Sequence, residues 1–159
     1  MDIKKTANLL LNFAIKRLAE IFGLFIFLSG TLLLIALISY SPEDPNFIFP
    51  DNTEIKNLLG FQGSFISDLF FQSIGLISYL ISFTLILTGI NIFRFKEFFL
   101  IIENIFFTII YCVFGTLFFS FFYSDAFTLY INGNGGFVGN YFNQTFLNSL
   151  VQIHETTSF

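Results

Sequence analysis

Three long apolar stretches divide the chain, and polar segments separate them. Residues 21–40 and 69–93 contain no charged residue, and residues 98–123 contain a single one, Glu103. A helix of twenty residues is about 30 Å long, which is the thickness of the hydrocarbon core of a bilayer. The sequence therefore predicts an all-α integral membrane protein with three transmembrane helices.

The first polar segment has helical periodicity. In residues 1–20, apolar positions gather on one face, and Lys4, Lys5, Lys16 and Arg17 lie largely on the other. This pattern predicts a basic amphipathic helix on the cytoplasmic leaflet. The apolar run that follows is longer than that of a signal peptide and lacks a small-x-small cleavage pattern, so we do not expect cleavage.

The next polar segment, residues 41–68, is predicted to be a periplasmic loop. Pro42 and Pro45 end the first span because proline lacks the N–H that a continuing helix needs. We expect one or two helical turns over residues 54–59, ended by Gly60, and an N-cap at Ser64.

The remaining segments are a tight cytoplasmic turn at residues 94–97 and a periplasmic segment at residues 124–159. In the latter, the glycine-rich residues 133–139 are predicted to be a flexible entry to an amphipathic, uncharged helix at the interface. The glycines do not have the spacing of a dinucleotide-binding loop. We therefore expect no contact with nucleotide or nucleic acid.

The basic residues divide unequally between the two sides of the three spans. Six lie on one side and Lys56 alone lies on the other. This is the distribution of the positive-inside rule, so we expect a cytoplasmic N-terminus. The six are Lys4, Lys5, Lys16, Arg17, Arg94 and Lys96.

Small residues recur at helical spacing in the second and third spans. Such residues allow close helix packing in lipid, and we expect the two stripes to face each other. The predicted packing positions are Gly75, Ser78, Ser82 and Gly89 in the second span and Cys112, Thr116 and Ser120 in the third, together with Thr108. Glu103 is expected to reach the membrane surface, or to pair with Lys96, because it lies close to the basic turn.

Composition supports a membrane protein. The chain is 55% hydrophobic and 11% charged, whereas a soluble domain carries about 25% charged residues. The 27 phenylalanines, with no tryptophan, are interpreted as bulk apolar filler. The one cysteine excludes an intrachain disulfide and a multi-cysteine metal site, and no cofactor or catalytic cluster is expected.

Four segments, in this order, resemble one family. They are residues 38–47 (ISYSPEDPNF), residues 57–71 (NLLGFQGSFISDLFF), residues 75–79 (GLISY) and residues 135–139 (GGFVG). Together they resemble the N-terminal four-helix membrane region of FtsK-type bacterial DNA translocases. The resemblance covers residues 15–152.

The resemblance implies a place in the bacterial inner membrane, enrichment at the division septum, and contacts with other divisome membrane proteins. The family's motor is a hexamer, so it also implies a homo-oligomer. The fourth span and the ATPase motor of the family, with its GxxxxGK[ST] motif, do not occur in these residues. The resemblance therefore implies anchoring and targeting in cell division and chromosome segregation, without catalysis.

The positions expected to be structural or partner-facing follow from these segments. Prolines and glycines set turns, and the two acids cap helix ends or meet a partner. They are Pro42, Asp44, Pro45, Gly60, Gly63, Asp68, Gly135, Gly136 and Gly139.

Two other classes of function stay open. A small channel or transporter subunit is suggested by Glu103, Asn104 and the two small-residue stripes. A membrane enzyme is the third alternative, although Cys112 and His154 lie in unrelated regions.

Overall fold

The computed structural model describes residues 3–45, 54–123 and 132–147, and all of its regular elements in these ranges are helical. Three helical stretches are long and apolar enough to cross a membrane, namely Ala7–Ile38, Gly60–Phe95 and Phe99–Phe122. The predicted fold class is thereby confirmed.

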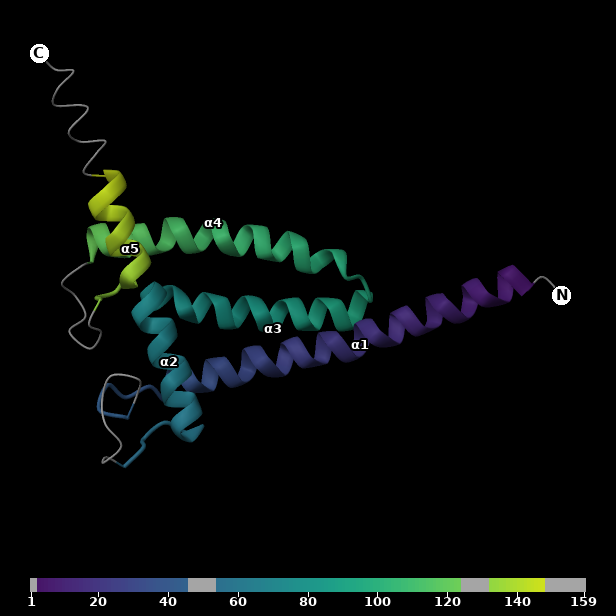
Figure 1. Cartoon of the computed structure of the whole chain (residues 1–159), viewed down its shortest axis with the longest axis horizontal. Helices are drawn as coiled ribbons and strands as arrows, with labels where there is room; N and C mark the ends of the chain where they lie inside the picture. The colour runs from purple at the N-terminus through teal and green to yellow at the C-terminus, as the bar shows by residue number, and fades with distance from the viewer. Residues whose placement is uncertain (1–2, 46–53, 124–131, 148–159) are drawn as a thin grey trace, which may run out of the picture.

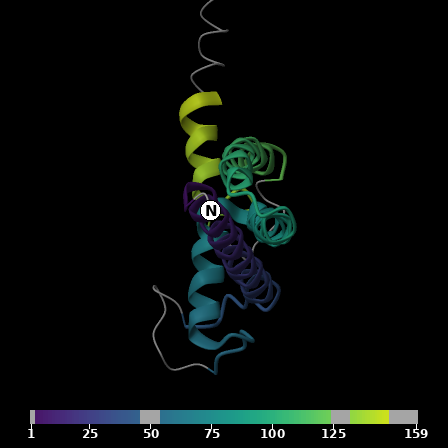
Figure 2. The ribbon, with the colours of Figure 1, turned by 90° about the vertical axis from the view of Figure 1, so that its right-hand side faces the viewer.

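Three long helices lie side by side, and two shorter ones run across one end of them (Figures 1 and 2). The long helices are α1 (Ile3–Ile38), α3 (Ser78–Phe95) and α4 (Phe99–Phe122). The crossing helices are α2 (Gly60–Ile74) and α5 (Gly136–Phe142). A 3₁₀ turn (Gly75–Ile77) joins α2 to α3, and a π turn (Asn143–Leu147) continues α5.

The chain changes direction at Gly75, within the predicted second span. Gly75 has φ +60°, a left-handed conformation that glycine adopts without steric cost. As a result, residues 69–74 belong to α2 and cross the end of the bundle, and α3 alone runs along it (Figure 1). With 18 residues, α3 is about 27 Å long, which is close to the thickness of the hydrocarbon core.

The N-terminal basic segment forms the predicted helix. Residues 3–20 are helical, but they continue the first span without a break and extend beyond the bundle (Figure 1). Where the extension leaves the bundle, Glu20 accepts bonds from Arg17 at 2.5 Å and from Lys96 at 2.7 Å. These contacts tie α1 to the turn between α3 and α4.

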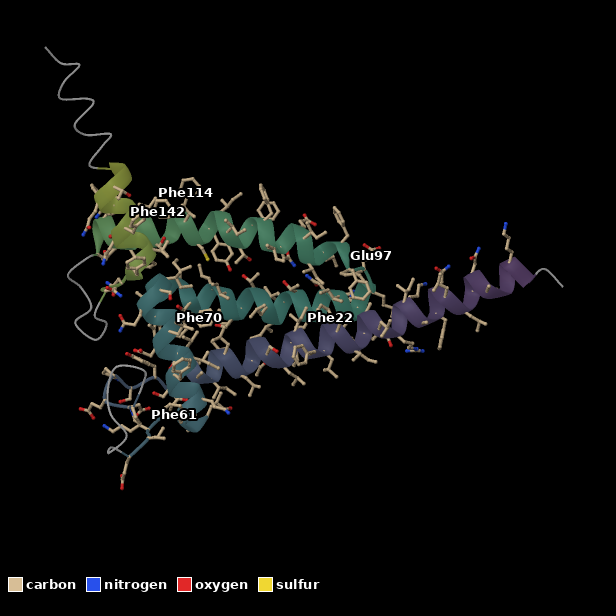
Figure 3. The ribbon with its side chains drawn as sticks, viewed as in Figure 1. Phe22, Phe61, Phe70, Glu97, Phe114 and Phe142 are labelled. Atoms are coloured by element: carbon tan, nitrogen blue, oxygen red, sulfur yellow. The ribbon has the colours of Figure 1, made fainter. Side chains whose placement is uncertain are left out.

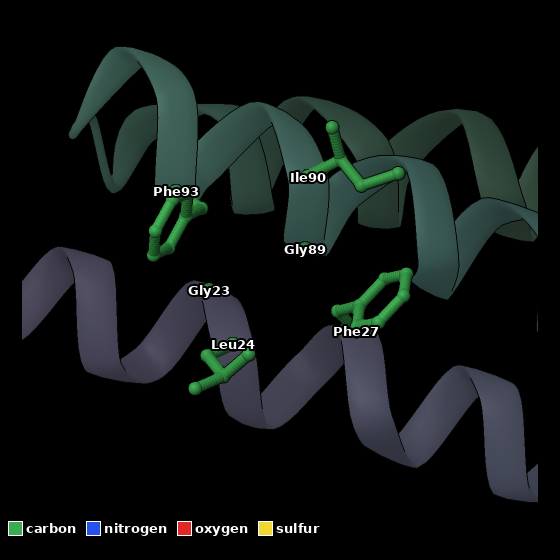
Figure 4. A pocket seen from close by; sticks show the side chains of 6 residues that line it. All are labelled: Gly23, Leu24, Phe27, Gly89, Ile90 and Phe93. Atoms are coloured by element: carbon green, nitrogen blue, oxygen red, sulfur yellow. The ribbon is translucent and has the colours of Figure 1, made fainter.

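Glycines bring α1 and α3 into close contact. A Cβ atom on Gly23 would lie 2.8 Å from the Gly89 carbonyl oxygen, and one on Gly30 would lie 2.8 Å from the Ile86 nitrogen. Figure 4 shows Gly23 and Gly89 facing each other, with Phe27 and Phe93 beside them. In lipid, where burial adds little, such backbone proximity is the main source of helix association.

Side-chain hydrogen bonds join α4 to α3. The Asn104 amide donates to the Thr88 hydroxyl at 2.8 Å, and the Thr84 and Tyr111 hydroxyls lie 2.9 Å apart. Much of α4 stays exposed, and Phe114 points away from the other helices (Figure 3).

Three members of the two small-residue stripes pack on elements other than the opposite stripe. Gly89 packs on α1, and Thr116 and Ser120 lie under the glycines of α5. Cys112 is half-buried, and its carbonyl accepts the Thr116 hydroxyl at 2.7 Å.

Candidate functional site at the α2–α5 end

The segments that resemble the translocase family meet at one end of the bundle. We call this region the α2–α5 end and define it as residues 39–45, 54–79 and 132–143. The turn after α3, where Figure 3 labels Glu97, lies at the opposite end, and Lys96 in that turn binds Glu20.

Asp44 is the most buried acid of the described chain, with 0% of its surface exposed. Its two carboxylate oxygens accept the backbone N–H groups of Lys56 and Asn57, each at 2.8 Å. A carboxylate that receives backbone N–H groups forms charge-assisted hydrogen bonds, which are stronger than neutral ones. Asp44 thus fastens the loop after α1 to the segment before α2, and it has no surface left for a partner.

Asn57, beside it, is the residue that binds this loop to α1. Its amide nitrogen donates to the Ala36 carbonyl at 2.9 Å, and its amide oxygen accepts the Leu59 N–H at 3.0 Å. A Cβ atom on Gly63 would lie 2.1 Å from this amide oxygen, so only glycine fits there. The structural role of Gly63 is to leave space for Asn57.

The start of α2 differs from the prediction. Gly60 begins the helix with φ +66°, and no helix precedes it within residues 54–59. Ser64 lies inside α2 and donates to the Pro45 carbonyl at 3.2 Å, so it is not an N-cap. The Gly60 N–H donates to the Asn57 carbonyl at 2.9 Å, which closes the turn before the helix.

Asp68 joins α2 to the end of α1. It is 6% exposed, and it accepts the Tyr40 hydroxyl at 3.0 Å. The ring of Phe71, 0% exposed, lies 4.9 Å from the Tyr40 ring and 5.5 Å from the Tyr79 ring. The Tyr79 hydroxyl then donates to the Leu37 carbonyl at 3.3 Å. This aromatic cluster is the centre of the packed end.

The bend at Gly75 is held by Asn134. The Leu76 N–H donates to the Asn134 carbonyl at 2.9 Å, and a Cβ atom on Gly75 would lie 1.9 Å from that oxygen. Gly136, with φ +64°, faces Gly75 in return, because a Cβ atom there would lie 2.6 Å from the Gly75 nitrogen. Gly75 and Gly136 therefore form the contact between two segments that lie 61 residues apart in the sequence.

The glycine-rich segment is closely packed, which differs from the predicted flexible entry. A Cβ atom on Gly135 or Gly139 would lie 2.6 or 2.4 Å from the Thr116 carbonyl oxygen. The Ser120 hydroxyl donates to the Asn140 amide oxygen at 2.8 Å. The small residues Thr116 and Ser120 of α4 therefore pack against α5, the helix that follows the glycines. The part of the predicted interfacial helix beyond residue 147 lies outside the described residues.

Charge at this end is mostly acidic, and the described residues there include one ion pair. Lys56 binds the exposed Glu43. The Lys56 ammonium lowers the pKa of the Glu43 carboxyl, and Glu43 in turn raises the pKa of Lys56. The single basic residue of this end is thereby neutralised locally. Pro42, next to Glu43, is exposed.

Sequence reasoning missed several residues of this region. Asn57, Asn134, Asn140 and Tyr40 take part in long-range hydrogen bonds, and none was singled out. A signal for the first two existed, since each asparagine lies just before a glycine cluster at a turn. The partner of each bond is set by the tertiary fold.

The acids and amides of this end have structural roles in the described part of the chain. Within the described ranges, no cluster of three His, Cys, Asp or Glu residues could hold a metal ion. Asp44, Asp68 and Asn57 are all engaged by hydrogen bonds within the chain. What the α2–α5 end offers is a rigid, folded surface.

The chain matches the family model described as the 4TM region of DNA translocase FtsK/SpoIIIE over residues 15–156. The chain belongs to this family. No curated protein and no solved structure matches it. It is accordingly a membrane domain of the FtsK/SpoIIIE type, and the four resembling segments are those that build the α2–α5 end.

Proposed function

We propose that these residues anchor an FtsK-like DNA translocase in the bacterial inner membrane and bring it to the division septum. In this proposal the domain carries out no catalysis. Its basic end lies in the cytoplasm, on the side where the family's motor acts on DNA, and its α2–α5 end lies in the periplasm and contacts other membrane proteins of the divisome.

The observation that carries the proposal is the convergence of the resembling segments at one end of the bundle. Asp44, Asn57 and Asn134 there make backbone hydrogen bonds between segments distant in sequence. Such a network specifies one conformation of a surface, which is what recognition by a protein partner requires. A domain that served only as an anchor would not need it.

The exposed residues around the network are the proposed partner surface. They include Pro42, Glu43 and Leu58, and Leu58 is 76% exposed. Leu58 has the highest exposure of the large apolar side chains in the described residues, and its backbone N–H is held by the Ser39 hydroxyl at 3.1 Å, so its position is fixed by the network. The channel alternative has less support, because Asn104 and Tyr111 are hydrogen-bonded between α3 and α4.

The experiment is to follow a fluorescent fusion of residues 1–159 in a rod-shaped bacterium. The ratio of septal to lateral fluorescence is divided by the same ratio for a membrane dye, which corrects for the two membranes at a septum. We expect the corrected ratio to exceed one. A ratio of one for the unaltered chain would contradict septal targeting.

Two matched variants then locate the surface. Leu58→Ser removes the exposed side chain at the α2–α5 end, and Leu9→Ser removes a similarly exposed leucine at the opposite end. We expect Leu58→Ser to lower the corrected ratio toward one and Leu9→Ser to leave it unchanged. Equal behaviour of the two variants would exclude the α2–α5 end as the partner surface.

A further inference from the structure

The N-terminal part of α1 extends past the level at which the other long helices end. That level is the turn between Phe95, where α3 ends, and Phe99, where α4 begins. Lys96 of this turn binds Glu20 of α1 at 2.7 Å. Residues 3–19, which we call the extension, lie beyond this contact and continue α1 for about 25 Å (Figure 1). Because α3 is about as long as the hydrocarbon core is thick, the extension lies outside the core.

The extension exposes large apolar side chains. Every residue from 7 to 18 is exposed, whereas the next residue, Ala19, is fully buried. Burial of apolar surface is the main favourable term in association, and an extension surrounded by water would forgo it. The exposed large apolar residues are Leu9, Leu10, Leu11, Phe13, Ile15 and Leu18.

The two sides of the extension differ in polarity. Residues seven apart lie on nearly the same side of a helix, so Lys16 shares the side of Gly23, which packs on α3. Leu10 lies five turns before Leu28, on the outer side of the span, where Leu28 is half-exposed. The apolar side of the extension therefore continues the outer side of α1. By the same spacing, this side comprises Ala7, Leu10, Ala14 and Leu18, with Lys4 and Arg17 at its two edges, and the polar side comprises Asn8, Asn12 and Lys16, with Leu9 and Ile15 at its edges.

The charge of the extension indicates what covers its apolar side. Residues 3–19 contain four basic residues and no acid, and within the described part of the chain Lys4 and Lys16 form no ion pair. A covering surface must therefore be apolar beneath the helix and anionic beside it. A second copy of the extension would cover the leucines but would bring the same positive charge. An anionic bilayer surface provides acyl chains and phosphates together, and it adjoins the helix where α1 leaves the core.

We propose that residues 3–18 bind the surface of an anionic phospholipid bilayer, as an interfacial helix that bends away from α3 ahead of Ala19. Bending in this direction turns the side of Leu10 toward the membrane and places Lys4 and Arg17 at the level of the phosphates. The amphipathic pattern alone predicts a surface helix. The structure adds the direction of the bend, because the apolar side continues the outer side of the span. This inference does not depend on septal targeting.

The test uses the absence of tryptophan from the chain. Leu10→Trp places a fluorophore on the apolar side of the extension, and Asn12→Trp places one on the polar side. Phe83→Trp, on the exposed surface of α3, is the control for lipid contact. Each full-length variant is put into vesicles of phosphatidylcholine and phosphatidylglycerol in which the phosphatidylcholine carries brominated acyl chains, which quench tryptophan on contact. Both leaflets have the same composition, so the orientation of the protein does not affect the result.

We expect the quenching of Leu10→Trp to be at least about twofold stronger than that of Asn12→Trp, because the far side of a helix lies about 10 Å from the surface that the helix covers. Phe83→Trp should be quenched in every vesicle. Leu18→Trp is a second variant on the apolar side, for use if circular dichroism shows that Leu10→Trp alters the helices.

Charge variants test the anionic part of the proposal. Salt screens the attraction between basic residues and an anionic surface, so added salt should weaken the quenching of Leu10→Trp. Lys4→Gln combined with Lys16→Gln should lower the salt concentration at which half of this quenching is lost. Lys56→Gln, at the opposite end of the bundle, is the matched control and should leave that concentration unchanged. Equal quenching of Leu10→Trp in phosphatidylcholine alone would contradict binding to anionic lipid.

Two further outcomes would overturn the proposal. Equal quenching of Leu10→Trp and Asn12→Trp would mean that the extension lies inside the bilayer as part of a longer span. An absence of quenching at Leu10→Trp and Leu18→Trp in the anionic vesicles, with Phe83→Trp quenched, would place the extension in water or against a second copy of the chain.

Discussion

The Asp44 carboxylate accepts the backbone N–H of Asn57 at 2.8 Å, with neither side chain exposed beyond 4%. Through this bond the turn after α1 and the turn before α2 have one fixed relative position. The Asn57 side chain also donates to the Ala36 carbonyl, which fixes both turns relative to α1. The sequence around Asp44 is typical of a surface loop, but the Asp44 side chain is buried and holds the two turns of the α2–α5 end together.

Asp44→Asn is predicted to destabilise the domain. An amide offers one acceptor oxygen where two backbone N–H groups need one each, so a buried donor is left unpaired at a cost of about 1–3 kcal/mol. The measurement is the free energy of unfolding in detergent micelles. Glu43→Gln, at the exposed neighbouring acid, is the control and should stay within about 0.5 kcal/mol of the unaltered chain. Similar values for the two variants would contradict the role of Asp44.

Gly89→Ala is predicted to push α1 away from α3. The new Cβ atom would lie 2.4 Å from the Phe27 backbone nitrogen, and backbone cannot move aside locally. We expect a loss of about 1–3 kcal/mol in unfolding free energy, which is typical of overpacking. Gly115→Ala is the comparison, because its Cβ would meet the far end of the Ile77 side chain, which can rotate. A smaller loss at Gly89 than at Gly115 would count against close α1–α3 packing.

Asn104→Leu is predicted to weaken the attachment of α4. It removes the bond to Thr88, and interhelical hydrogen bonds in membranes contribute about 0.6 kcal/mol on average. A double-mutant cycle with Thr88→Val measures this coupling.

We also expect proteoliposomes to show no ion flux above that of protein-free vesicles, with or without Glu103→Gln. A flux that depends on Glu103 would instead favour the channel alternative.

Glu43 and Lys56 are predicted to give a pH-dependent contact on the exposed turn. The pKa of Glu43 is lowered from its ordinary 4.5 by Lys56, so its contribution to stability is present above pH 4.5 and is lost as the pH falls through the lowered pKa. The pKa of Lys56 is raised from 10.5, so the contact is lost again as the pH rises through that raised value. Carboxyl-carbon NMR should give Glu43 a pKa below 4.5 that returns toward 4.5 in Lys56→Gln. An unchanged value in that variant would contradict the pairing.

The apolar runs were enough to predict the number and order of the long helices. A run of twenty uncharged residues has few alternatives in a helical membrane protein. The predicted turn at residues 94–97 is shifted in the structure, because α3 continues to Phe95 and α4 begins at Phe99. The bend at Gly75 was not readable, because it depends on the Asn134 carbonyl that approaches from the far end of the chain.

The candidate site was readable only in part. Its segments were recognisable as motifs. The burial of Asp44 and the space that Gly63 leaves for Asn57 depend on the tertiary structure, so they could not be predicted from the motifs. Gly23 and Gly30 were passed over because glycine in an apolar run gives no local signal of the helix that packs on it. Of the two alternatives for Glu103, reaching the membrane surface stays a prediction, and the ion pair that the structure gives Lys96 is with Glu20 on α1.

The proposed function requires that the two ends of the bundle face different compartments. Cysteine labelling in whole cells tests this topology directly. Cys112 is the one cysteine, so Cys112→Ala gives a background in which Lys56→Cys and Arg94→Cys mark the two ends. We predict that a membrane-impermeant maleimide labels Lys56→Cys in intact cells and labels Arg94→Cys only after the cells are opened. Labelling of Arg94→Cys in intact cells, with Lys56→Cys protected, would invert the topology and contradict the proposed function.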